Sequence, residues 1–272
     1  EFTYTPSGLV GEDTLSDITL SRAEGDNVGT YEITAAQKKD ANPNYSVKFN
    51  KGTFTINPKE ITVTITPNGG TYEGNIISAA AVLNGLVGED KPEIILTYAG
   101  KVNDGTEVNG TKTPVLAGTY TVTASITDSN YNLKAEGTTA EFVVTKATPG
   151  LSVAAVSDKS YGEGAFKLGV SNKGDGLKSY VSSNEKVVTV DEKGTVTIVG
   201  AGTATLTVSL AESANYTADR KAVTVTVAPK EITVTADNQK KIAGEADPVL
   251  TYTADGLVGE DTLSGITVKR KA

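Results

Sequence analysis

Short runs of alternating polar and apolar residues recur along the chain, and each run predicts a half-buried β-strand. In the first quarter of the sequence these runs are Phe2–Thr5, Ile18–Ser21, Thr30–Ala35, Tyr45–Phe49 and Thr53–Ile56. Asn50-Lys51-Gly52 predicts a tight hairpin between the last two, because its glycine can adopt positive φ.

The same alternation continues through the rest of the chain. The further predicted strands are Ile61–Thr66, Glu93–Tyr98, Gly118–Thr127, Ala140–Thr145, Tyr180–Asn184, Val187–Asp191, Gly194–Ile198, Gly200–Val208 and Ala222–Val227. Residues 76–83 form a less polar stretch that fits one helical turn or an irregular strand equally well. Many short strands separated by turn residues predict an all-β fold built from sandwiches.

Two peptide words repeat and set the organisation of the chain. Gly-Leu-Val-Gly-Glu-Asp stands at Gly8–Asp13, Gly85–Asp90 and Gly256–Asp261, and Pro-Lys-Glu-Ile-Thr-Val-Thr stands at Pro58–Thr64 and Pro229–Thr235. The second word precedes the first by 27 positions both times (85 − 58 and 256 − 229). One structural unit therefore starts near residue 58 and starts again near residue 229.

These repeats divide the chain into four segments. Residues 249–270 align on residues 1–22 with 15 of 22 positions identical. We therefore interpret 1–57 as the C-terminal part of a truncated repeat, 58–147 as a complete repeat and 229–272 as the N-terminal part of a truncated repeat. The pattern changes between them, and 148–228 is a module of another type. The sequence has no initiating Met, signal peptide or sorting tail, and we interpret it as an excerpt from a longer protein.

Two family resemblances follow from the motifs. The pattern Ser-Ser-Asn-x-x-Val-x-x-Val-Asp-x-x-Gly-x-Val-Thr-Ile within Tyr180–Val208 resembles the bacterial Ig-like group 2 (Big2) domain, which recurs in surface proteins such as intimin- and invasin-type adhesins. The other units, with Tyr-Thr-x-x-Gly-Leu-Val-Gly-Glu-Asp before Gly-Thr-Tyr and Asn-Tyr, resemble MBG repeats of large bacterial surface proteins. Residues 59–147 depart from that pattern after Asp90 with a longer insert around Lys101–Thr113. The resemblances imply tandem small antiparallel β-sandwich or Ig-like modules in an elongated rod, and neither family implies a fixed catalytic or ligand-binding residue set.

Composition narrows the chemistry. The chain has no Cys, His, Met or Trp, which excludes the usual zinc sites and Ser-His or Cys-His catalysis. The absence of Cys fits a cytosolic protein or a bacterial surface protein that avoids free thiols. A net charge of −8 disfavours nucleic acid and anionic membranes as partners.

Two recurring polar features are candidate sites. The paired acids Glu12-Asp13, Glu89-Asp90 and Glu260-Asp261 suggest a metal site, but Ca²⁺ takes six or more oxygens. We therefore expect a structural turn, with its Leu and Val directed inward and its acids solvated or capping amides. Each unit also has one Asn-Tyr pair, and these are Asn44-Tyr45, Asn130-Tyr131 and Asn215-Tyr216. An exposed Tyr could stack on a sugar, whereas a Tyr placed alike in every module is more simply a core ring whose hydroxyl bonds to nearby backbone.

No catalytic constellation emerges. Glycoside hydrolysis requires two carboxylates across a cleft, and the acids here are scattered over strands and turns. We expect no enzyme activity, no catalytic or metal-binding residues and no cofactor, and the sequence does not identify ligand-binding residues. Lys–Asn isopeptide crosslinks would require a buried Lys, Asn and acid, and the sequence singles out no such triple.

The leading functional hypothesis is a non-catalytic structural or adhesive stalk of a bacterial cell-surface protein, which is extracellular and spaces a binding region from the cell wall. The alternative is a glycan- or protein-binding accessory module of a secreted or surface-attached enzyme. The expected partners are a host or microbial surface protein or a glycan, with no nucleic acid and no membrane contact by this segment. A third hypothesis is head-to-tail self-association, in which Lys230–Ile242 of one molecule completes residues 1–57 of the next.

Overall fold

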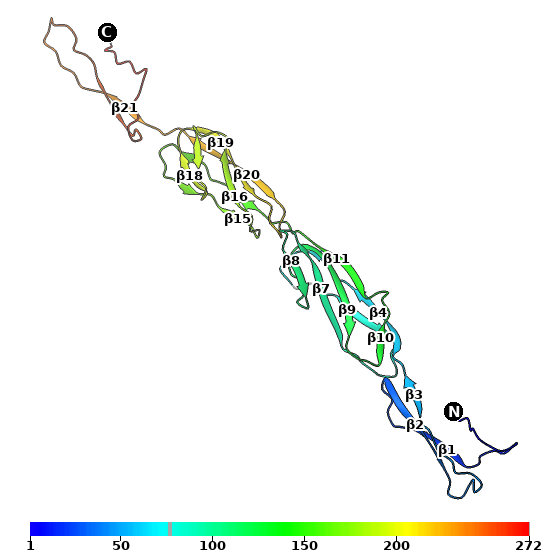
Figure 1. Cartoon of the computed structure of the whole chain (residues 1–272). Helices are drawn as coiled ribbons and strands as arrows, with labels where there is room; N and C mark the ends of the chain where they lie inside the picture. The colour runs from blue at the N-terminus through cyan, green and yellow to red at the C-terminus, as the bar shows by residue number, and fades with distance from the viewer. Residues whose placement is uncertain (76–77, 272) are drawn as a thin grey trace. The chain divides into compact units, whose positions relative to one another are not determined.

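A computed structural model describes residues 1–75 and 78–271 (Figure 1). The chain forms two compact units, one of residues 1–70 and 75–143 and the other of residues 71–74 and 144–272. Every regular element in the described residues is a β-strand. The fold is therefore all-β, with the strands grouped in several small sheets, as the alternating sequence predicts.

The N-terminal module, residues 1–57, contains one antiparallel sheet. Its strands, in the order β1-β2-β3, are β1 (Ile18–Arg22), β2 (Gly29–Gln37) and β3 (Gly52–Ile56). All three confirm predicted strands. The register sets Ile18 opposite Gln37 and Tyr31 opposite Phe54.

Three local predictions for this module are wrong. Phe2–Thr5 and Tyr45–Phe49 do not form strands, because no strand among the described residues pairs with them in a hydrogen-bonded ladder. Asn50-Lys51-Gly52 is not a hairpin, since β3 pairs with β2 instead of with Tyr45–Phe49. Alternation identified the residues that can form strands, whereas strand formation also requires a partner.

The complete repeat, residues 58–147, forms two sheets. The first has the order β10-β4-β6, with β10 (Tyr131–Leu133), β4 (Lys59–Thr66) and β6 (Ala80–Asn84). The second has the order β5-β11-β9-β7-β8, with β5 (Gly70–Thr71), β11 (Thr139–Thr145), β9 (Gly118–Ile126), β7 (Ile94–Val102) and β8 (Glu107–Gly110). Strand β4 is central in its sheet, antiparallel to β6 and parallel to β10.

The structure shows the conformation of part of two stretches that the sequence left ambiguous or irregular. The less polar stretch 76–83 ends in strand β6, and its Ile76 and Ile77 lie outside the described residues. The insert around Lys101–Thr113 contains β8, which pairs with the end of β7 as an antiparallel hairpin. The insert therefore extends one edge of the sheet.

The core of this repeat is built from inward-facing residues of both sheets. Ile61 and Val63 of β4 are 2% and 4% exposed. Tyr120 and Val122 of β9 are 1% and 0% exposed. The Tyr120 ring lies 5.4 Å from that of Phe142, measured between centroids. Two facing sheets with alternating buried residues make a small β-sandwich.

The third module, residues 148–228, has a separate core in the second unit. Its principal sheets have the orders β13-β20-β19-β16 and β14-β18-β17, and β12 pairs with β15. The strands are β12 (Ser152–Val153), β13 (Lys159–Ser160), β14 (Phe166–Lys167), β15 (Val170–Ser171), β16 (Lys178–Ser182), β17 (Val188–Val190), β18 (Thr195–Ile198), β19 (Gly202–Leu210) and β20 (Asp219–Ala228). Strand β13 runs parallel to β20, while the other paired strands of this module are antiparallel.

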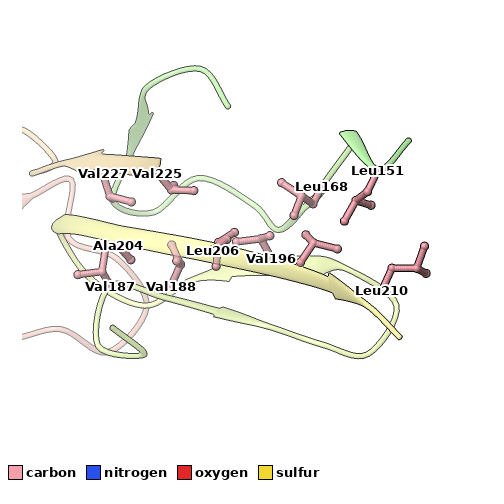
Figure 2. Close-up of a cluster of buried hydrophobic side chains, with 11 residues drawn as sticks. Leu151, Leu168, Val187, Val188, Val196, Ala204, Leu206, Leu210, Val225 and Val227 are labelled. Atoms are coloured by element: carbon pink, nitrogen blue, oxygen red, sulfur yellow. The ribbon is translucent and has the colours of Figure 1, made fainter. Parts of the chain in front are cut away.

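Figure 2 shows the cluster of buried aliphatic side chains of this module, in which Leu206 of β19 is 1% exposed and Val196 of β18 is 0% exposed. Burying one such side chain contributes about 1.5–3 kcal/mol relative to leaving it in water. The cluster draws residues from both principal sheets, so it holds the two layers together.

The C-terminal segment contains one antiparallel pair, β21 (Thr233–Ala236) and β22 (Tyr252–Asp255). Thr233 lies opposite Asp255, and in the complete repeat Thr62 lies opposite Asn84. Both differences equal 171 (233 − 62 and 255 − 84), so β21 and β22 repeat the β4–β6 pairing in the same register. The sequence word that β4 and β21 share therefore specifies the same local structure in both places.

Candidate functional site: a turn closed by a tyrosine

The Gly-Leu-Val-Gly-Glu-Asp word forms the same tight turn in all three copies. In each copy the N–H of the Asp donates to the carbonyl oxygen of the Val at 3.1 Å. The pairs are Asp13 with Val10, Asp90 with Val87 and Asp261 with Val258. The second glycine has φ of 58°, 53° and 55° respectively. Positive φ at this position followed by negative φ at Glu is the geometry of a type II′ turn. The expected structural turn is therefore present.

The side chains of the turn point differently from the expectation. Val10 is 73% exposed and Val87 is 54% exposed, so the prediction that valine is directed inward is wrong for these two copies. Both valines therefore lie at the solvent-exposed tip of the turn. Leu9 and Leu86 are half-buried, so of the two apolar side chains of the turn only the leucine is directed toward the module.

In the N-terminal module, Tyr45 closes the turn. The Val10 N–H donates to the Tyr45 hydroxyl oxygen at 3.0 Å. The same hydroxyl donates to Asp13 Oδ2 at 2.5 Å. One phenol thus binds both the backbone and the carboxylate of the turn, which fixes its orientation.

The complete repeat makes the same arrangement with Tyr131. The Val87 N–H donates to the Tyr131 hydroxyl oxygen at 3.1 Å, and the hydroxyl donates to Asp90 Oδ2. Tyr131 is 6% exposed, which confirms that it is a core ring. Its hydroxyl has a backbone partner as expected, and it also has a carboxylate partner that the sequence reasoning missed. The sequence signal for this pair was that each unit contains one turn and one Asn-Tyr.

The third turn is closed by a residue of a different module. The hydroxyl of Tyr161 donates to Asp261 Oδ2 at 2.9 Å. A Cβ on Gly162 would lie 2.7 Å from Val258 Cγ2, so the absence of a side chain there lets the turn pack closely. Val258 is half-buried, unlike its counterparts Val10 and Val87.

Hydrogen bonding to a carboxylate changes the acidity of these phenols. The bond to Asp13 raises the pKa of Tyr45 above its usual 10.0. Bonds to Asp90 and Asp261 raise the pKa of Tyr131 and Tyr161 in the same way. An ionised phenol would lose its donor proton and face a negative carboxylate, so the neutral form is favoured.

The asparagine of the second Asn-Tyr pair, Asn130, has a role separate from that of the tyrosine. The Val28 N–H donates to Asn130 Oδ1 at 2.8 Å, and Asn130 Nδ2 donates to Asn27 Oδ1 at 3.0 Å. Asn130 therefore connects the complete repeat to the module before it, within the same compact unit. Asn215 is buried at 8% exposure, and the ring of its neighbour Tyr216 makes an edge contact with Tyr72 at 5.5 Å.

The paired acids do not assemble a metal centre. Glu12, Glu89 and Glu260 are exposed. Across residues 1–75 and 78–271, no cluster of three or more His, Cys, Asp or Glu could hold a metal ion. Over the same residues there is no helix with the length and apolar character needed to cross a membrane.

The N-terminal module contains a hollow of about 620 Å³. Residues 3–9 line one side of it, residues 45–52 line another, and its floor includes Leu20, Ile33 and Ala35. No counterpart of Tyr120 or Val122 is fully buried here, since Tyr31 and Ile33 of β2 are both half-buried. The hollow therefore lies over the inner face of the β1-β2-β3 sheet, between residues 3–9 and residues 45–52.

Comparison with protein-family models separates the repeats from the third module. Residues 1–55 and 232–272 match the model "MBG domain (YGX type)", and residues 61–148 match "MBG domain". Residues 161–212 match "Intimin, immunoglobulin-like domain". None of the curated proteins matches the chain.

Several solved structures resemble the chain at low identity. The Drosophila N-cadherin fragment EC1-3 is 11% identical, with 82% of this chain and 92% of that chain covered and a TM-score of 0.24. Domains 1–6 of the surface layer protein SbsC are 18% identical, with 77% of this chain covered and a TM-score of 0.29, and this chain spans only 33% of that structure. A SusE-like surface-located polysaccharide binding protein of Bacteroides thetaiotaomicron is 12% identical, with 79% and 54% covered and a TM-score of 0.19.

The repeated turns, the repeated strand register and the family matches agree on one organisation. The matched segments support tandem MBG-type repeats with an intimin-type Ig-like domain among them.

Proposed function

We propose that this chain is a non-catalytic structural segment of a bacterial cell-surface protein, located outside the cell, which spaces a binding region from the cell wall. The MBG-type and intimin-type matches support a surface-protein module. Within this proposal the third module belongs to the bacterial Ig-like group 2 family, on the strength of its Ser182-Ser183-Asn184 motif and the Gly-Ala-Gly-Thr-Ala that follows at Gly200–Ala204.

The observation that carries the spacer role is the tied junction between the first two modules. Strand β3 ends at Ile56 and β4 begins at Lys59, so only Asn57 and Pro58 connect them. Proline fixes its own φ and restricts the residue before it. The side chain of Asn130 adds its two hydrogen bonds to residues 27 and 28. A short, restricted connection with a side-chain tie resists folding back.

Small-angle X-ray scattering, extrapolated to zero concentration, tests this role. A compact protein of this length has a radius of gyration of about 19 Å, and a spacer requires a clearly larger value. Asn130→Ala removes both bonds of the tie and lowers the mean radius by loosening the junction. Asn132→Ala, at an exposed position of β10, is the matched control and leaves the radius unchanged. A wild-type value near that of a compact protein would contradict the spacer role.

A further inference from the structure

All three Asn-Gly pairs of the chain lie in the complete repeat, and they are Asn68-Gly69, Asn84-Gly85 and Asn109-Gly110. In such a pair the backbone nitrogen of the glycine can attack the side-chain carbonyl carbon of the asparagine. Glycine allows the approach because it has no Cβ and few conformational restrictions. The attack requires that the side-chain amide and the following N–H are both free to move, so the fold decides which pair reacts.

Two of the pairs are held by sheets. Asn84 is the last residue of β6, and its Nδ2 donates to Thr64 Oγ1 at 3.2 Å. Asn109 and Gly110 end β8, where Gly110 lies opposite Tyr98 of β7. A paired, extended backbone holds each side chain out of the plane of the ladder. The strand must therefore deform before the glycine nitrogen can reach the Cγ of the asparagine.

Asn68 has neither restraint. Residues 67–69 connect β4 to β5 and belong to no strand. The side chain of Asn68 is exposed. Among the described residues, neither its amide nor the N–H of Gly69 has a hydrogen-bond partner. Both reacting groups are thus free, and the backbone that carries them is not fixed by a ladder.

We propose that Asn68 is a site of spontaneous deamidation. The Gly69 nitrogen bonds to Asn68 Cγ, the Cγ–Nδ2 bond breaks, and ammonia leaves with the proton that the Gly69 nitrogen gives up. The product is a cyclic succinimide. Water is the co-reactant that opens the ring. Opening at Cγ gives aspartate, and opening at the backbone carbonyl gives isoaspartate, whose main chain runs through the side-chain carbon.

The connection at Asn68 is sensitive to this change. It joins β4 of one layer of the sandwich to β5 of the other. Gly69 lies close against β11, since a Cβ there would be only 2.8 Å from the Val143 carbonyl oxygen. Isoaspartate adds a methylene group to the main chain immediately before this contact. The added length displaces Gly69 from β11, so the isoaspartyl form unfolds at a lower urea concentration.

Peptide mapping by mass spectrometry, on the full chain incubated at mildly alkaline pH, measures the three rates together. Each deamidation replaces an NH2 group by OH, which changes the mass of the peptide. In the folded protein Asn68 reacts several-fold faster than Asn84 and Asn109. In guanidinium chloride the ladders are absent, and the three pairs react at similar rates. Equal rates in the folded protein, or a folded Asn68 that reacts much more slowly than the unfolded one, would overturn the proposal.

Asn68→Gln tests the structural consequence. Glutamine would have to close a larger ring, so this peptide gains no mass and the urea midpoint of the variant does not change on incubation. The midpoint of the wild type falls with its isoaspartate content, which enzymatic methylation of isoaspartyl groups measures. Asn109→Gln, at an exposed position of β8, is the matched control and loses stability as the wild type does. A wild-type midpoint that stays constant while isoaspartate accumulates would refute the effect on the sandwich.

Discussion

The hydroxyl of Tyr45 donates to Asp13 Oδ2 across 32 positions of the chain, and the hydroxyl of Tyr131 donates to Asp90 Oδ2 across 41. The nine additional positions (41 − 32) do not change the contact. The complete repeat carries the longer insert between these two residues, and part of it forms the β7–β8 hairpin at the edge of the sheet. The contact between the tyrosine and the turn is therefore the same in two modules of different length.

Removing the Tyr131 hydroxyl tests the contribution of this contact. Tyr131→Phe leaves the Val87 N–H without its acceptor and Asp90 without its donor. An unpaired polar group near the core destabilises the fold. The urea midpoint of this module therefore falls, while the slope of the unfolding free energy against urea concentration is unchanged. Tyr4→Phe is the control, since Tyr4 is 44% exposed and its single bond, to the Leu15 carbonyl, is 3.4 Å long. Equal shifts for both variants would show that the contact contributes nothing.

Alkaline pH should weaken the same contacts. The pKa values of Tyr45 and Tyr131 are raised above 10.0 in the folded state by their carboxylate partners. The contribution is fully present below the unfolded pKa and is lost as pH rises through the folded pKa, because the unfolded chain then releases the proton more readily. Urea midpoints therefore fall from about pH 10 upward. The Tyr45→Phe/Tyr131→Phe double variant should show a shallower fall, and a parallel fall would contradict this assignment.

The turn glycine can be tested without steric complication. A Cβ at Gly88 would meet no atom within 4 Å, yet its φ is +53°. Gly88→Ala should therefore cost about 1–2 kcal/mol from backbone conformation alone. Gly88→Asn should cost less, because asparagine is, with glycine and aspartate, a residue that type I′ and II′ turns favour. Gly164→Ala, in open space without a left-handed φ, should be neutral or stabilising. Chemical denaturation of the three variants makes the comparison.

The core of the Ig-like domain should respond to truncation as a packed interior does. Leu206→Ala leaves a cavity at a position that is 1% exposed. The expected loss of unfolding free energy is about 2–5 kcal/mol. Val181→Ala, on an exposed position of β16, should change it by less than about 0.5 kcal/mol. A small effect of Leu206→Ala would mean that this module relaxes around the missing atoms.

Sequence patterns predicted the strands that have partners. Gly-Thr-Tyr at the start of β2 and β9 identified a strand in both modules, and the shared Pro-Lys-Glu-Ile-Thr-Val-Thr predicted equivalent strands at β4 and β21. The run Phe2–Thr5 has the same alternation but no strand, because alternation describes the faces of a strand and is silent about its hydrogen-bonding neighbour.

The sequence predicted the two parts of the site but not the contact between them. Glycine at two fixed positions predicted a tight turn, and one Asn-Tyr per unit predicted a core tyrosine. Nothing local to either word indicated that the two touch, since their contact depends on how the intervening strands bring them together. Asp261 is bonded to Tyr161 of the Ig-like domain instead of to the tyrosine of an Asn-Tyr pair. The sequence pattern could not predict this partner, because Tyr161 belongs to no repeated word.

Asn130 and Tyr131 are neighbours in sequence, yet the asparagine bonds to residues 27 and 28 while the tyrosine closes the turn of its own repeat. Two adjacent residues thus stabilise the repeat internally and attach it to the preceding module. A repeat transplanted into a foreign array would bring its turn closure intact and lose its docking, unless the new neighbour offered an amide and an asparagine at the matching loop. Shuffling of such modules is therefore constrained at their loops as well as at their linkers.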